Sequence, residues 1–171
     1  RTDLASIYFQ ENKIDAAKKE FDIAIRNYKA VGQKAPLGRN YLQLGNFYFR
    51  EKEYKSSEAA YLEAAKYLHE AGNFEEGLVA QNELCKVYET IGEFEKGINT
   101  SKKSITLIED YFKNKPAGSA NRRSAGQSFF WMSRLYKVAG DYEGALQVIR
   151  RGRQFYPAAF DSGARAPWMA E

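Results

Sequence analysis

The sequence predicts an all-α fold in which helical hairpins stack one after another. The chain of 171 residues is rich in Ala, Glu, Lys and Leu and has only four prolines, a composition that favours helices. A pattern of aromatic and small residues returns about every 40 residues, which is typical of repeat architectures. Inside each copy the apolar residues recur at steps of three and four, the spacing of one face of an α-helix.

Three tyrosines, Tyr8, Tyr48 and Tyr88, define the period, because they lie 40 residues apart. The residues around them repeat at the same interval: Leu4, Leu44 and Leu84 before them, and Ile14, Tyr54 and Phe94 after them. A fourth copy surrounds Tyr136, which follows Tyr88 by 136 − 88 = 48 residues, so eight residues have been inserted. We place the insertion in residues 113–123, where Pro116 and Gly118 indicate a longer surface connection.

The first two copies are each predicted to form two helices joined by a short break. The breaks fall at residues 12–13 and 52–53, and Pro36 suits the first turn of the helix that opens the second copy. An apolar stripe marks the second helix of each copy: Ile14, Ala17, Phe21, Ala24 and Tyr28, then Tyr54, Ser57, Tyr61, Ala64 and Leu68. Such a stripe aligns side chains on one helix face, so each copy is predicted to be a helical hairpin.

The third and fourth copies are predicted to follow the same plan, with breaks at residues 92–93 and 140–141. Asn73 can cap the third hairpin, since Glu75 and Glu76 then lie where the helix dipole favours negative charge. The predicted repeats are 1–34, 37–73, 75–113 and 124–157, which together form one domain over 1–157.

The third copy departs from the pattern where its predecessors carry Ala17 or Ser57, Phe21 or Tyr61, and Ala24 or Ala64. Gly97, Ser101 and Ser104 stand in its second helix, and something bulky must fill the space that they leave. We expect residues 129–132, at the start of the fourth hairpin, to pack there and conserve volume. The alternative is a loose joint between the third and fourth hairpins.

The pattern resembles the tetratricopeptide repeat family, most closely in the second copy. The matching residues there are Tyr41, Leu44, Gly45, Tyr48, Tyr54, Ser57, Tyr61 and Ala64. The resemblance implies a superhelix of hairpins, a solenoid, with a concave groove that holds a peptide or helix of a partner protein. The longer period is similar to that of kinesin light chains, Leu-Gly-Asn-rich polarity scaffolds and bacterial peptide-sensing regulators.

The resemblance also implies that the first helix of every hairpin lines the groove. The candidate peptide-binding residues are Phe9, Arg39, Gln43, Asn46, Arg50, Asn82, Lys86, Trp131 and Arg134. Asparagine amides can pair with an extended peptide backbone, and the cations can hold acidic side chains or a free C-terminus. The set is similar to the carboxylate clamp of co-chaperone repeats, although Glu83 and Glu89 interrupt the basic row. The alternative is that these residues are ordinary solvated polar side chains.

The sequence points away from catalysis, cofactors and metals. It contains no phosphate loop, nucleophile elbow or Cys-His pair, and its one histidine, His69, is predicted to be a solvated residue near a helix end. A net charge of +4 is spread along the chain, which makes nucleic acid an unlikely partner. The basic clusters at 122–123 and 149–153 suit a surface loop and a helix end.

A mean hydropathy of −0.61 and the lack of a long apolar run argue against membrane insertion. One cysteine, with no secretion signal or lipid anchor in the sequence, suggests the cytoplasm. The function predicted is a scaffold for protein interaction, with no enzyme activity. The alternative is a sensor module that controls an effector, such as a DNA-binding or kinase domain, outside this segment.

The residues after the fourth hairpin, 158–171, do not repeat, yet they contain Phe160, Trp168 and Met169. We expect this tail to cap the apolar end of the last hairpin. An incomplete fifth hairpin, or a segment that enters a groove in its own or a neighbouring molecule, would be compatible with the same residues.

Overall fold

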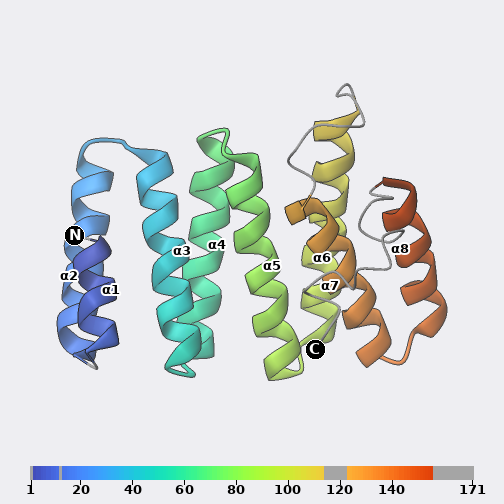
Figure 1. Ribbon diagram of the computed structural model, residues 1–171, viewed down its shortest axis with the longest axis horizontal. Helices are drawn as coiled ribbons and strands as arrows, with labels where there is room; N and C mark the ends of the chain where they lie inside the picture. Colours follow the sequence, from blue (N-terminus) through green and yellow to red (C-terminus); the bar gives the residue numbers. More distant parts are fainter. Residues whose placement is uncertain (1, 12, 114–122, 156–171) are drawn as a thin grey trace. The chain divides into compact units, whose positions relative to one another are not determined.

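The computed structural model describes residues 2–11, 13–113 and 123–155, and every regular element within those ranges is an α-helix (Figure 1). The helices are α1 (Thr2–Gln10), α2 (Ile14–Ala30), α3 (Lys34–Arg50), α4 (Tyr54–Glu70), α5 (Phe74–Ile91), α6 (Phe94–Phe112), α7 (Arg123–Val138) and α8 (Tyr142–Phe155). The predicted all-α fold of consecutive helical hairpins is confirmed.

The helix ends lie where the sequence places them. Pro36 lies in the first turn of α3, and α5 begins directly after Asn73. The inserted residues fall between the end of α6 and the start of α7, as predicted. The proline and glycine of that connection lie outside the described residues, as does the tail over 158–171 that we expected to act as a cap.

The chain divides into two compact units, Arg1–Ala80 and Gln81–Glu171. In the first unit, α1 packs against α2, α2 against α3, and α3 against α4 (Figure 1). One core cluster of this unit contains Ala5, Ala17, Phe21, Leu44, Phe47 and Ala60, and another contains Ala64, Ala65, Leu68 and Ala80. In the second unit, α7 packs against both α6 and α8.

Small residues allow the two helices of the second hairpin to approach each other closely. A Cβ atom on Gly45 would lie only 2.5 Å from the Tyr61 ring. The Ser57 hydroxyl donates a 2.9 Å hydrogen bond to the Gly45 carbonyl oxygen. The repeat signature therefore has a direct steric meaning here: glycine in α3 makes room for a fully buried tyrosine in α4.

The third hairpin exchanges the large and small residues of this contact. The positions equivalent to Gly45 and Tyr61, 40 residues later, are Cys85 and Ser101. Both are buried, and Cys85 Sγ lies 3.1 Å from Ser101 Oγ. The thiol therefore occupies part of the volume that an aromatic ring occupies in the second hairpin. Burial raises the pKa of the Cys85 thiol to about 12, so the thiol stays protonated at neutral pH.

The space beside Gly97 is filled by Leu135 of α7. A Cβ atom on Gly97 would lie 2.8 Å from Leu135 Cδ1. The residue beside Gly97 thus comes from the fourth hairpin, as expected, but it lies outside the predicted segment 129–132. Within that segment, Phe129 and Met132 are themselves buried, at 1% and 7% exposure.

A left-handed residue closes the turn inside the second, third and fourth hairpins. The residues are Lys52, Gly92 and Gly140, with φ angles of 61°, 77° and 85°. A left-handed backbone is unfavourable for a residue with a Cβ atom. Lys52→Gly is therefore expected to raise the free energy of unfolding by about 0.5–1 kcal/mol, after allowance for the greater freedom of glycine in the unfolded chain.

Urea unfolding of the Lys52→Gly variant measures this gain as a higher midpoint at unchanged slope. Gly92→Ala is the matched control, since it places a Cβ atom on the equivalent left-handed turn and should lower the midpoint. An unchanged or lower midpoint for Lys52→Gly would mean that the turn is not strained.

Candidate functional site: polar residues on the first helices

Four of the predicted groove residues form one solvent-facing row on α3. Arg39, Gln43, Asn46 and Arg50 are all exposed. Residues between them in sequence, such as Leu44 and Phe47, are buried in the first unit. The row therefore lies on the face of α3 opposite the core, as the spacing of its residues predicts.

The Asn46 side chain is oriented by the hairpin's central tyrosine. The Tyr61 hydroxyl donates a 2.7 Å hydrogen bond to Asn46 Oδ1. Since Tyr61 is 0% exposed and belongs to α4, the second helix of the hairpin determines how the amide is turned. Within the part of the chain that the structure describes, Asn46 Nδ2 has no hydrogen-bond acceptor. The amide therefore presents a donor whose direction is set before any ligand arrives.

Arg50 lies one turn further along α3 and is held by an aromatic ring. Its guanidinium carbon is 4.4 Å from the centroid of the Phe9 ring. Phe9, from α1, in turn packs edge-on against Phe47, with ring centroids 4.9 Å apart. A guanidinium that stacks on a ring keeps its edge free for hydrogen bonds. Phe9 thus supports Arg50, and its direct contact with a ligand stays a prediction.

Arg39, at the start of the row, is engaged by α5. Its Nε and Nη2 atoms donate hydrogen bonds of 2.7 and 2.9 Å to the two carboxylate oxygens of Glu76. This hydrogen bonding raises the pKa of Arg39 above its usual value. Because Glu76 compensates its charge, Arg39 is a weaker candidate for an acidic ligand than Arg50.

The predicted cations of the second unit interact with side chains of the same unit. Arg134 Nε donates a 2.6 Å hydrogen bond to Glu89, and its guanidinium carbon lies 5.5 Å from the Trp131 ring centroid. Lys86 Nζ lies 3.8 Å from a carboxylate oxygen of Glu83. The acidic residues that interrupt the basic row in the sequence thus lie beside its cations in the structure.

Asn82 is a structural residue, which corrects its assignment to a ligand groove. It is only 4% exposed. Its Nδ2 donates a 3.1 Å hydrogen bond to the Ser124 carbonyl oxygen, and the Ser128 hydroxyl donates a 2.8 Å hydrogen bond to its Oδ1. The amide therefore joins α5 to the first turns of α7.

Asn82→Ala is expected to lower the free energy of unfolding by about 1–3 kcal/mol, because it removes both hydrogen bonds of a buried amide. Gln43→Ala truncates an exposed amide on α3 and should change the free energy of unfolding by less than about 0.5 kcal/mol. Thermal or urea unfolding of the two variants checks the contrast. Equal stabilities would return Asn82 to the list of ligand-binding candidates.

His69 also differs from its predicted solvated setting. A Cβ atom on Gly77 would lie 2.6 Å from the His69 ring, so the imidazole packs directly against the backbone of α5. Its ring centroid lies 6.2 Å from that of Phe74. No group of three or more His, Cys, Asp or Glu side chains within the described residues is arranged to hold a metal ion.

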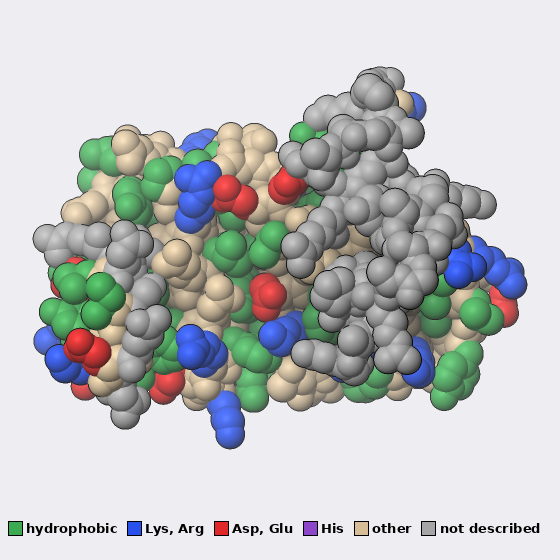
Figure 2. Space-filling model, in the orientation of Figure 1, with side chains coloured by type: hydrophobic (Ala, Val, Ile, Leu, Met, Phe, Trp, Pro, Cys, Tyr) green, Lys and Arg blue, Asp and Glu red, His purple; other side chains and the backbone are tan. Residues whose placement is uncertain are grey.

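Charged side chains of both signs are mixed on the face of α1 to α4 that Figure 2 shows. On that face the described Lys and Arg side chains are interspersed with acidic, apolar and other polar ones and form no continuous basic surface. Nucleic-acid binders usually gather their cations on one face. Over residues 2–11, 13–113 and 123–155, no helix combines the length and hydropathy that a bilayer crossing requires.

Comparison with known proteins identifies one sequence repeat and the fold. A sequence profile described as tetratricopeptide repeat matches residues 38–67, which cover most of α3 and α4. No curated protein matches the sequence significantly.

Two solved structures are similar to this one. BtubC (BKLC) from P. vanneervenii has 17% sequence identity and a TM-score of 0.70, over 92% of this chain and 62% of that one. A Podosopora anserina putative kinesin light chain with nearly identical TPR-like repeats has 14% identity and a TM-score of 0.64, over 94% of this chain and 75% of that one. This chain thus spans less than two thirds of BtubC. It carries a tetratricopeptide repeat at residues 38–67, and its fold is that of tetratricopeptide-like repeat proteins.

Proposed function

We propose that this chain is a non-catalytic interaction scaffold that binds an extended peptide segment of a partner protein along α3. Tetratricopeptide repeats generally mediate protein–protein interactions. The observation that carries the proposal is the oriented Asn46 amide, whose Oδ1 accepts a hydrogen bond from Tyr61 while Nδ2 has no acceptor among the residues that the structure describes. The single, buried cysteine suits a reducing compartment, and we place this activity in the cytoplasm.

The row on α3 has the chemistry that an extended peptide needs. Asn46 Nδ2 can donate to a peptide carbonyl oxygen, which would otherwise lose its hydrogen bond to water on binding. Arg50 lies four residues later on the same helix face, so it can hold an acidic side chain or a C-terminal carboxylate of the same peptide. Gln43, three residues before Asn46, extends the row by one turn.

Preorganisation is what distinguishes Asn46 and Arg50 from other exposed polar residues of α3. A side chain that is already immobilised loses less entropy on binding, and each loose side chain that a ligand must order costs about 0.5–1.5 kcal/mol. Tyr61 immobilises Asn46, and the Phe9 ring supports Arg50. Both supports belong to the folded repeat, so the folded chain presents these donors together.

Selection of peptides from a random library displayed on phage, with the wild-type chain as bait, tests the proposal. The peptides selected should carry an acidic residue or act through their C-terminus, and their affinity is then measured for point variants. Asn46→Asp is the informative change, because it keeps the acceptor for Tyr61 and removes the outward donor. We expect it to weaken binding at least about tenfold, which corresponds to 1.4 kcal/mol.

Arg50→Gln should weaken the same peptides by a similar factor. Lys55→Ala is the matched control, since it removes an exposed cation from α4, outside the row. Thermal unfolding should show no loss of stability in any of the three variants beyond about 0.5 kcal/mol. Peptides that bind the Asn46→Asp and Arg50→Gln variants as tightly as the wild type would exclude α3 as the site.

A further inference from the structure

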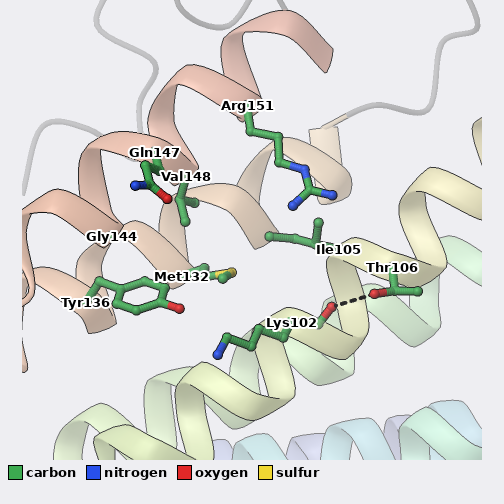
Figure 3. Close-up of a pocket in the computed structure, with 9 residues that line it drawn as sticks. All are labelled: Lys102, Ile105, Thr106, Met132, Tyr136, Gly144, Gln147, Val148 and Arg151. Atoms are coloured by element: carbon green, nitrogen blue, oxygen red, sulfur yellow. Dashed lines mark hydrogen bonds between the residues drawn. The ribbon is translucent and has the colours of Figure 1, made fainter.

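The second unit contains a pocket of about 470 Å³ between α6 and α8. Figure 3 shows its walls, with side chains from α6 and α8 on two sides and α7 between them. The lining residues are Lys102, Ile105, Thr106, Met132, Tyr136, Gly144, Gln147, Val148 and Arg151. The volume falls in the range of about 300–1,000 Å³ that is usual for small-molecule sites.

The pocket has an apolar floor and a polar rim. Ile105, Met132 and Val148 are at most 7% exposed and form the floor. Lys102 and Gln147, both exposed, contribute polar groups from α6 and α8. Such a combination suits a ligand with an apolar body and one polar group, because the floor removes apolar surface from water while the rim fixes orientation.

The charge of the rim indicates which polar group the ligand should carry. The nine lining residues include two cations and no Asp or Glu. Arg151 donates hydrogen bonds of 2.7 and 2.8 Å to the two carboxylate oxygens of Glu109, which ties α8 to α6 beside the pocket. The Arg151 charge is therefore compensated, although the guanidinium has further N–H groups to offer.

Lys102 carries the uncompensated charge. Among the described residues, no carboxylate oxygen lies within 4.0 Å of its Nζ. Its Nζ lies over the Tyr136 ring, 6.0 Å from the ring centroid. In Figure 3 the ammonium group extends along the lower edge of the pocket, on the side of the Tyr136 hydroxyl. An anionic ligand would give this ammonium its charged partner.

We propose that this pocket is a binding site for a small organic carboxylate with an apolar body, held by an ion pair to Lys102. The apolar body lies over Met132 and Val148, and Gln147 or the Tyr136 hydroxyl donates a further hydrogen bond to the carboxylate. The site contains no residue of α3, so this proposal does not depend on the proposed peptide-binding function.

Methionine methyl resonances provide a local readout of this site. The chain contains only two methionines, Met132 and Met169, so ¹³C-methyl labelling gives two signals, and the Met132→Leu variant identifies which is which. Titration with 4-phenylbutanoate should shift the Met132 signal saturably, with a Kd of about 1 mM for a probe of this size. The uncharged analogue 4-phenylbutanamide should bind at least about fivefold more weakly, because it cannot form the ion pair.

Lys102→Gln is expected to weaken 4-phenylbutanoate roughly tenfold and to leave the amide within about twofold of its wild-type affinity. Lys103→Gln, an exposed lysine of α6 that does not line the pocket, is the matched control and should leave both probes unchanged. The far-ultraviolet circular dichroism of each variant should match that of the wild type. A match shows that weaker binding is not caused by loss of the helical fold.

Three results would overturn the proposal: no saturable shift of the Met132 signal, equal affinity for the carboxylate and the amide, or equal losses in the Lys102→Gln and Lys103→Gln variants. The first would show that the pocket does not bind this class of ligand. The second and third would show that the Lys102 charge does not select the carboxylate.

Discussion

Tyr61→Ser is expected to lower the free energy of unfolding by about 3–5 kcal/mol, because it empties the centre of the second hairpin. The Tyr61 ring is 0% exposed and lies against the backbone of Gly45. The change also removes the hydrogen bond to Asn46. Urea unfolding measures the loss, and a value below about 1.5 kcal/mol would mean that the helices close up over the cavity.

A second substitution tests whether volume is exchanged between the two helices. Gly45→Cys alone should cost about 1–3 kcal/mol, because its side chain would overlap the Tyr61 ring. Combined with Tyr61→Ser, it reproduces the pair that the third hairpin carries as Cys85 and Ser101. The double variant should therefore be more stable than the sum of the two single losses predicts.

The coupling free energy of this double-mutant cycle is the measured quantity. We expect it to favour the double variant by about 1–3 kcal/mol, the range found for residues in contact. Strictly additive losses would contradict the exchange of side-chain volume between the two helices. They would indicate that the Cys and Ser pair packs well only among the other residues of the third hairpin.

Phe129→Ala is expected to cost about 3 kcal/mol, because the side chain is only 1% exposed in the second unit. Leu107→Ala is the control: Leu107 is a large apolar residue of α6, in the same unit, and it is 39% exposed. Its truncation should cost less than about 1 kcal/mol, since it removes little surface that folding buries. A similar loss for both variants would contradict the burial of Phe129.

The unfolding curve of Phe129→Ala also tests the predicted single domain over 1–157. If the hairpins unfold cooperatively, the curve keeps one transition and moves as a whole. Separation into two transitions would instead show that Arg1–Ala80 and Gln81–Glu171 unfold as independent units.

The fold could be predicted from the sequence because its elements depend on short-range patterns. Steps of three and four residues define a helix face, and the 40-residue period defines the hairpin. Both the breaks between helices and the insertion before α7 are visible as local changes in that pattern. The solvent-facing row on α3 could be predicted for the same reason.

The roles of individual site residues could be predicted only in part. Asn46 and Asn82 are the same residue type on first helices, yet one is exposed and the other is 4% exposed. A signal was present in the repeat register: the position 40 residues before Asn82 is Leu42, whereas Lys86 is the equivalent of Asn46. Alignment to the period would have placed Asn82 among the apolar positions that face a neighbouring helix.

The sequence by itself determined the helices, their order and the sides of each that face core or solvent, because these follow from residue spacing along one helix. Only the tertiary structure decided which polar side chains are available. Tyr61 orients Asn46 from 15 residues away, Glu76 compensates Arg39 from 37 away, and Ser124 and Ser128 enclose Asn82 from 42 and 46 away. A hydrogen bond depends on distances of about 3 Å between atoms of different helices, and no periodicity within one helix specifies those distances.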